Sequence, residues 1–157
     1  IAQATEGVPF NNISINESPT PISSVIFEDF SGQEVNLKNY KGKLIILNFW
    51  ATWCAPCKKE MPSLDSLYQD RRFKTLQVFA VNMEKPNKLK TKKFFTDLNI
   101  KKLEIFFDSK LNFVKEFKLR GVPTTIFINK QGEEFARIIG EANFEDQKFI
   151  KWLMKYD

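Results

Sequence analysis

The chain has 157 residues, of which 43% are hydrophobic and sixteen are Phe, which suits one domain with a single hydrophobic core. Its formal net charge of +5 comes mainly from Lys, a strongly hydrated point charge that is less suited than Arg to bidentate phosphate recognition. We therefore expect a solvated basic surface and no nucleic-acid partner. Histidine is absent, which excludes His-based catalysis and most transition-metal sites.

The N-terminal segment 1–22 is rich in Asn, Ser, Thr and Pro and shows no sustained periodicity. We expect an irregular tether there, with the folded domain over 23–157. No run reaches the roughly 18 to 20 apolar residues that a membrane-spanning helix needs. The chain starts at Ile1 without a basic segment followed by an apolar one, so we expect that any export signal or membrane anchor has already been removed.

The next segments alternate between strand and helix patterns. Two short strands over 24–28 and 34–37 form a predicted hairpin, followed by a helical turn to residue 40. The later elements are a buried strand over 43–50, a helix after residue 54, a strand over 75–81, a Lys-rich helix over 87–98, a strand over 103–107, a helix over 109–117, a hairpin of 124–129 with 134–139, and a helix over 144–156. This order predicts an α/β fold with a central mixed sheet covered by helices on both faces.

The only two cysteines, Cys54 and Cys57, lie where the buried strand passes into a helix. A cysteine at a helix N-terminus has a lowered thiol pKa, because the unpaired N–H groups and the helix dipole stabilise the thiolate. Cys54 has that position and is the expected nucleophile, and Cys57, about one turn later, is the expected resolving thiol. Pro56 suits the first helical turn and stiffens the loop between the sulfurs.

Other uses of this cysteine pair fit the sequence less well. A structural zinc site usually takes four Cys or His ligands, and a copper-delivery module needs histidine or more sulfur, so we expect no metal. A purely structural disulfide would close too short a loop to restrict the unfolded chain much. The pair therefore indicates redox catalysis, with no cofactor beyond a redox-active Cys54–Cys57 disulfide.

Two motifs carry a family resemblance. The segment FWATWCAPC at Phe49–Cys57 resembles the active-site segment of the thioredoxin superfamily, and GVPTT at Gly121–Thr125 resembles its cis-proline loop. Asn48 before the first motif, KKEMP at Lys58–Pro62 after it, and an extra helix and strand before the second are similar to the exported TlpA, ResA and CcmG branch. The resemblance implies a thioredoxin fold with an N-terminal hairpin extension and an inserted helix–strand segment, so that 23–157 is a thioredoxin-like domain.

The resemblance also implies that the Val122–Pro123 peptide bond is cis; an ordinary turn before the next strand is the alternative. Pro123 has no N–H, and the backbone of Val122 beside it can pair with an extended substrate segment and present a substrate disulfide to Cys54. Trp53 is expected to cover Cys54 and to offer a flat docking surface, whereas Trp50 is expected in the core. The expected substrate-contacting residues are Trp53, Ala55, Pro56, Val122 and Thr124.

Proton transfer requires a group other than the buried Asp of cytosolic thioredoxins, because Asn48 has that place and cannot titrate. Glu60 follows Cys57 by three residues and lies on a neighbouring face of the same helix. Reductive members of the exported branch carry an acid at this place. We hypothesise that Glu60 accepts the Cys57 proton. The alternative is a solvent-exposed helical Glu with no part in the chemistry.

The resemblance implies a thiol-disulfide oxidoreductase and favours a reductase in the periplasm or another extracytoplasmic location. Its clients would carry cysteine pairs, as apocytochrome c or copper-site precursors do, and its electrons would come from a membrane thiol donor. A disulfide oxidase or isomerase remains an alternative, although the chain lacks the lid helices and the motif histidine that would favour it. A redox-inactive binding module is a second alternative. A peroxiredoxin is disfavoured because Ala51 stands where its Thr should be.

Overall fold

One mixed sheet forms the centre of the molecule. The structure, a computed structural model, describes residues 8–157 and orders the strands of that range as β1-β8-β7-β4-β5-β6-β2-β3. The strands are β1 (Ile13–Pro21), β2 (Ile26–Glu28), β3 (Glu34–Asn36), β4 (Ile45–Trp50), β5 (Gln77–Asn82), β6 (Ile105–Phe107), β7 (Thr124–Ile128) and β8 (Glu133–Ile139). The neighbours β4, β5 and β6 run parallel, and the other pairs are antiparallel.

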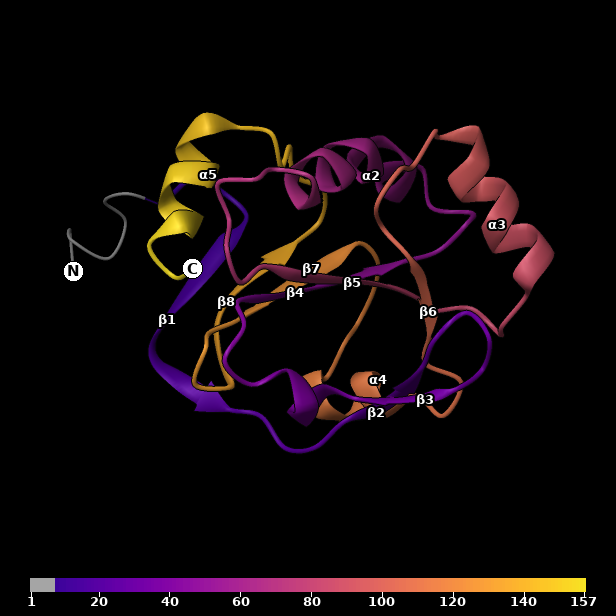
Figure 1. Cartoon of the computed structure of the whole chain (residues 1–157), viewed down its shortest axis with the longest axis horizontal. Helices are drawn as coiled ribbons and strands as arrows, with labels where there is room; N and C mark the ends of the chain where they lie inside the picture. The colour runs from indigo at the N-terminus through magenta and orange to yellow at the C-terminus, as the bar shows by residue number, and fades with distance from the viewer. Residues whose placement is uncertain (1–7) are drawn as a thin grey trace.

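Helices cover both faces of this sheet (Figure 1). They are the single 3-10 turn η1 (Leu37–Tyr40), α2 (Ala55–Tyr68), α3 (Lys88–Asp97), α4 (Asn112–Phe117) and α5 (Gln147–Met154). In Figure 1, α2, α3 and α5 lie on one face, and α4 and η1 lie on the other. The predicted mixed sheet flanked by helices is therefore confirmed.

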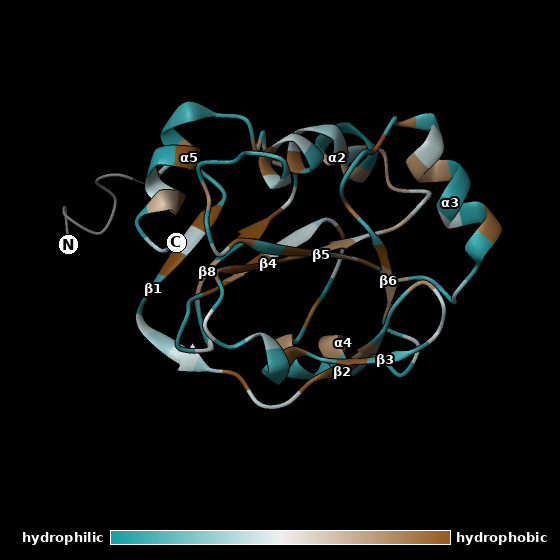
Figure 2. Cartoon of the chain, in the orientation of Figure 1, coloured by the Kyte–Doolittle hydropathy of each residue, from teal (hydrophilic) through white to brown (hydrophobic). Residues whose placement is uncertain are grey.

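The central strand β4 serves two cores at once. Its alternate residues Ile46 and Trp50 pack with α2, α3 and α5, while Ile45, Leu47 and Phe49 pack with α4 and the β2–β3 hairpin. All of β4 is buried, which explains why its sequence is an apolar run rather than an alternating pattern. Figure 2 shows the central strands mostly in the hydrophobic colour. Asn48 is the polar exception, and by strand alternation it faces α2.

The predicted additions to the sheet are present. β2 and β3 form the expected antiparallel hairpin, and α3 and β6 form the inserted helix–strand segment between β5 and β7. The helix expected over 109–117 begins only at Asn112. The Asp108 carboxylate accepts hydrogen bonds of 2.9 Å and 3.0 Å from the backbone N–H groups of Asn112 and Phe113, and it thereby satisfies the first donors of α4.

The prediction of an irregular segment over 1–22 is wrong for Ile13–Pro21, which form β1. β1 pairs antiparallel with β8, with Ile13 opposite Ile138. β1 is an edge strand, so its prolines are tolerated because hydrogen bonds are needed on one side only. Its partner lies more than a hundred residues away in sequence, which a local pattern cannot reveal. Residues 1–7 of the same segment lie outside the described residues.

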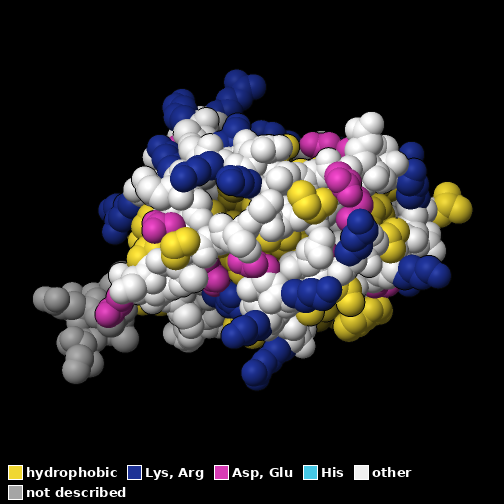
Figure 3. Space-filling view, turned by 90° about the horizontal axis from the view of Figure 1, so that it is seen from below, with side chains coloured by type: hydrophobic (Ala, Val, Ile, Leu, Met, Phe, Trp, Pro, Cys, Tyr) yellow, Lys and Arg dark blue, Asp and Glu magenta, His cyan; other side chains and the backbone are white. Residues whose placement is uncertain are grey.

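The charged surface is mixed in sign where it can be seen. On the face shown in Figure 3, basic and acidic side chains are interspersed rather than gathered into one basic block. Among the residues that the structure describes, no helix is both long enough and apolar enough to cross a membrane.

Candidate active site

The end of β4 and the start of α2 position the cysteine pair. Cys54 is the N-cap residue of α2, and its Sγ accepts a hydrogen bond of 3.2 Å from the backbone N–H of Cys57. The two cysteines form a disulfide. Cys54 keeps 4% of its surface exposed, whereas Cys57 is fully buried. A thiolate at Cys54 would have both the free N–H groups of the helix and some access to solvent, which supports its predicted role as the nucleophile.

The loop before β7 lies beside the cysteine-bearing end of β4. Thr124 is paired with Phe49 in antiparallel register, and the Val122–Pro123 peptide bond next to it is cis, as the resemblance implies. The Thr124 hydroxyl donates a hydrogen bond of 2.8 Å to the Gly121 carbonyl, and the Gly140 N–H donates one of 2.9 Å to the Pro123 carbonyl. These bonds hold the loop from both sides.

The predicted substrate-contacting residues differ in accessibility. Trp53 is 73% exposed, and Ala55 and Pro56 are also exposed. The Val122 backbone N–H and carbonyl have no hydrogen-bond partner among residues 8–157 and are free to pair with an extended peptide. Thr124 is buried and its hydroxyl is already bonded within the loop, so its contribution is limited to holding the shape of that loop.

Glu60 lies on the buried face of α2, the helix that begins at the cysteines, so the alternative of a solvent-exposed Glu is wrong. One carboxylate oxygen accepts a hydrogen bond of 2.7 Å from the Asn48 side-chain amide, and the other accepts one of 3.2 Å from the Ala142 N–H. Burial raises the pKa of Glu60 to about 7, against the lowering effect of these two hydrogen bonds. The group can therefore both hold and release a proton near neutral pH.

Asn48 faces Glu60 purely as a donor. Its side-chain amide also donates to the Thr125 hydroxyl at 3.0 Å, while its carbonyl oxygen has no partner within the described residues. Among residues 8–157, Glu60 accepts hydrogen bonds from Asn48 and Ala142 but forms none with Cys57. A proton passing between them would cross through a water molecule or follow a small movement of the side chain.

Comparisons with known proteins agree with this geometry. The profile of the AhpC/TSA family matches residues 20–133. The thiol-disulfide oxidoreductase ResA of Geobacillus kaustophilus is 35% identical over 77% of this chain and 68% of its own. The chain belongs to the ResA-like thiol-disulfide oxidoreductases of the AhpC/TSA family.

Two further comparisons describe the extent of the likeness. The ResA of Halalkalibacterium halodurans is 36% identical over 69% of this chain, and the match spans only 60% of that protein. The crystal structure of StoA from Bacillus subtilis has a TM-score of 0.69 and 28% identity, and covers 85% of this chain and 99% of its own. The ResA-like site is thus set in the expected thioredoxin fold.

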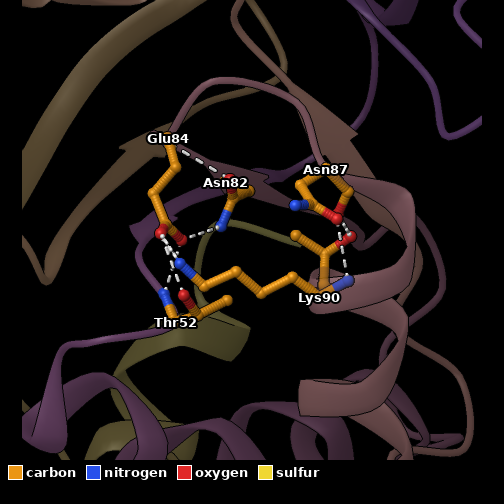
Figure 4. A network of polar contacts seen from close by, with 6 residues as sticks. Thr52, Asn82, Glu84, Asn87 and Lys90 are labelled. Carbon is orange, nitrogen blue, oxygen red and sulfur yellow. Dashed lines mark hydrogen bonds and ion pairs between the residues drawn. The ribbon is translucent and has the colours of Figure 1, made fainter.

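A second carboxylate, absent from the sequence-based site, holds the segment before Cys54 in this ResA-like chain. Glu84 accepts hydrogen bonds from the Thr52 N–H at 2.7 Å and the Thr52 hydroxyl at 2.9 Å, and from the Asn82 amide at 3.0 Å (Figure 4). Lys90 of α3 forms an ion pair with it at 3.1 Å. β5 lies parallel to β4, so an acid just beyond its carboxyl end is near the start of the cysteine segment. An acidic residue just after this strand is the sequence signal that could have identified Glu84.

We expect Glu84→Gln to destabilise the fold at pH 7 by about 1 kcal/mol, a modest value for charged hydrogen bonds because the side chain is partly solvated. Burial alone would raise the pKa of Glu84, but hydrogen bonds from Thr52, Asn82 and Lys90 outweigh it and lower the pKa to about 2. The folded pKa thus lies below the unfolded value of 4.5, so this stability is present above pH 4.5 and lost as pH falls towards 2. Urea unfolding of both proteins across this range tests it, with exposed Glu145→Gln as the control. A pH-independent difference would contradict the assignment.

Proposed function

We propose that the chain is a reductase of disulfides in client proteins outside the cytoplasm, with the Cys54–Cys57 dithiol as its redox centre. The observation that carries the proposal is the disulfide at the N-terminus of α2, beside a cis-proline loop whose Val122 backbone is unpaired within the described residues. The helix N-terminus favours the thiolate form of the attacking sulfur, and the cis-proline loop offers backbone groups to a client segment. A purely structural disulfide would need neither.

The proposed reaction is an exchange of one disulfide for another. The Cys54 thiolate attacks a client sulfur, which forms a mixed disulfide and releases the second client sulfur as a thiol after protonation. Cys57 then loses its proton to Glu60 and attacks the Cys54 sulfur, which breaks the mixed disulfide. The client gains two electrons and two protons, and the Cys54–Cys57 disulfide is left. No cofactor beyond that disulfide is required.

The supply of electrons and the client class are proposed from the family likeness. The protein must be reduced again after each cycle, and a membrane-bound thiol donor is the proposed source. Clients with paired cysteines, as in apocytochrome c or copper-site precursors, are the proposed substrates. A periplasmic or other extracytoplasmic location goes with both proposals, because client disulfides form and persist outside the reducing cytoplasm.

The direction of electron flow is tested by the reduction potential. Thiol-disulfide proteins range from about −270 mV for thioredoxin to about −120 mV for a strong oxidase. We expect the potential to lie near the reducing end, as measured by equilibration of the Cys54–Cys57 pair with glutathione mixtures. A potential near the oxidising end would instead support a disulfide oxidase or isomerase. A pair that does not exchange with glutathione would support a redox-inactive binding module.

Apart from Lys90, the exposed lysines of helix α3 are expected to have no part in catalysis. Lys88, Lys92 and Lys93 are exposed, and the apolar residues of the helix suffice to explain its packing, notably Phe94 and Phe95 against Trp50. Reversing all three charges to Glu should change the turnover of a small disulfide by less than about threefold, because solvated charges interact weakly. A reductase assay with purified protein measures this. A collapse of turnover would show that α3 contributes to the site.

A further inference from the structure

A groove runs beside the cis-proline loop. It has a volume of about 460 Å³, and its apolar lining includes Leu119, Val122, Pro123 and Ile139. Ile139 is 60% exposed, which is unusual for a large apolar side chain at the end of a buried strand. Because the same groove contains Val122 and Pro123, a client segment bound along the loop would lie over this surface.

The charges along the groove have one sign. Its lining includes Lys118, Arg120 and Arg137 and no carboxylate. Arg137 is already engaged, since it forms a 2.8 Å ion pair with Glu134 and donates a hydrogen bond to the Phe117 carbonyl. Lys118 and Arg120 are exposed, and neither side chain has an ion-pair or hydrogen-bond partner among residues 8–157. Two cations are therefore left for a bound molecule.

We propose that this groove binds an extended protein segment in which an acidic residue lies close to the reacting disulfide. The inference rests on the proposed reductase function and specifies the partner of the same site. The apolar floor takes an aliphatic or aromatic side chain of the client, and Lys118 and Arg120 attract the acidic one. The backbone groups of Val122 hold the segment in register between them.

The charge arrangement explains why an acidic segment is preferred. A neutral client gains only the apolar contacts and the backbone pairing, and a basic client also meets two unpaired cations with no carboxylate in the groove to offset them. A partner of opposite charge mainly gains a higher rate of productive encounter, and a partner of like charge is disfavoured. Salt screens this effect when the charges are solvent-exposed, as these are.

The first test uses the wild-type protein and three synthetic peptides, each with one internal disulfide. The residues flanking a cysteine are Asp in the first peptide, Asn in the second and Lys in the third. The measured quantity is the second-order rate constant for oxidation of the reduced protein by each peptide. We expect the Asp peptide to react roughly three- to tenfold faster than the Lys peptide at low salt, with the difference shrinking at about 0.5 M NaCl.

The second test changes the groove. The double variant Lys118→Glu, Arg120→Glu should reverse the order of the Asp and Lys peptides. The matched control Lys92→Glu, Lys148→Glu makes the same change in net charge on exposed residues outside the groove lining, and it should keep the wild-type order. Circular dichroism confirms folding of each variant, and the wild-type comparison among peptides does not depend on any variant.

Each other outcome overturns the inference. Equal rate constants for the three peptides would leave the reductase function intact and exclude a charge preference in the groove. An equal effect of both double variants would assign the preference to net charge. No reaction with any peptide would remove the proposed function and this inference with it. A dimer in sedimentation that is lost only in the groove variant would make the groove a contact between copies of the chain.

Discussion

Cys57→Ser protein, reduced and then mixed with a disulfide client, is expected to accumulate as a mixed disulfide through Cys54. Cys54→Ser protein is expected to form no adduct, and both variants should lose essentially all turnover. The reason is geometric: Cys54 is the N-cap of α2 with some solvent access, whereas Cys57 is fully buried and can react only with a sulfur already held at Cys54. Mass spectrometry of the intact protein measures the adduct.

The control for this experiment is the double variant Cys54→Ser, Cys57→Ser, which should retain the fold and carry no adduct. A serine at the Cys54 position preserves an N-cap acceptor for α2, so a large loss of helix is not expected. Adduct formation by the Cys54→Ser protein, and none by the Cys57→Ser protein, would reverse the two assigned roles.

Glu60→Gln is expected to lower reductase turnover by about a hundredfold, the lower end of the typical contribution of a positioned general base. Amide and carboxyl groups have nearly the same shape, so the variant keeps the packing under α2 and loses the titratable group. Since the pKa of Glu60 is raised to about 7, mainly by burial, turnover of the wild type should rise with pH through about 7 as the carboxylate becomes able to accept the Cys57 proton. This inflection should be absent from the variant.

Stability provides an independent measurement of the same group. The folded pKa of Glu60, about 7, lies above its unfolded value of 4.5. The stability linked to its protonated form is therefore fully present below pH 4.5 and is lost as pH rises through 7. Between pH 4.5 and pH 7 the wild type should lose up to about 3 kcal/mol of stability relative to Glu60→Gln, since each pKa unit corresponds to about 1.4 kcal/mol.

Thiolate absorbance against pH distinguishes the proton acceptor from a merely buried acid. In the wild type the two thiols and Glu60 should titrate as a coupled set, whereas the Gln variant should show the thiols alone. Superimposable absorbance curves together with equal turnover would show that water or another group takes the Cys57 proton. A stability difference without a change in turnover would leave Glu60 as a buried structural acid.

Several parts of the fold were predictable because their signals are local. The apolar run before Cys54 predicts a strand buried on both faces, and the order of strand, CAPC motif and amphipathic helix places Cys54 at a helix N-terminus. The β2–β3 and β7–β8 hairpins follow from turn residues between short strand patterns. The cis Val122–Pro123 bond was expected only from the resemblance to the thioredoxin superfamily, since the residues from 121 to 125 alone do not show whether the bond is cis.

Other parts depended on groups outside the segment whose pattern was read. β1 contains Asn, Ser and Pro and its sequence predicts irregular structure, yet it is a strand because the edge of β8 supplies its hydrogen bonds. Helix α4 starts later than its pattern predicts: Leu111 is its N-cap residue, and the Asp108 carboxylate accepts the first N–H groups of the helix. In both cases the hydrogen-bonding group that sets the structure, a strand backbone or a carboxylate, lies outside the segment, so the pattern of that segment cannot reveal it.

The same division applies to the active site. The sequence by itself determined the reacting pair, Cys54 and Cys57, and the class of their chemistry, because both thiols and the helix that activates them are contiguous. Only the tertiary structure decided that Glu60 is buried with a pKa of about 7, that Glu84 holds Thr52, and that Lys118 and Arg120 border the groove at the cis-proline loop. The burial, hydrogen-bond partners and neighbouring charges of these residues depend on which distant segments pack together. Because β4 lies between β5 and β7, the segments that follow β4 and β5 and the loop that precedes β7 meet at one end of the sheet.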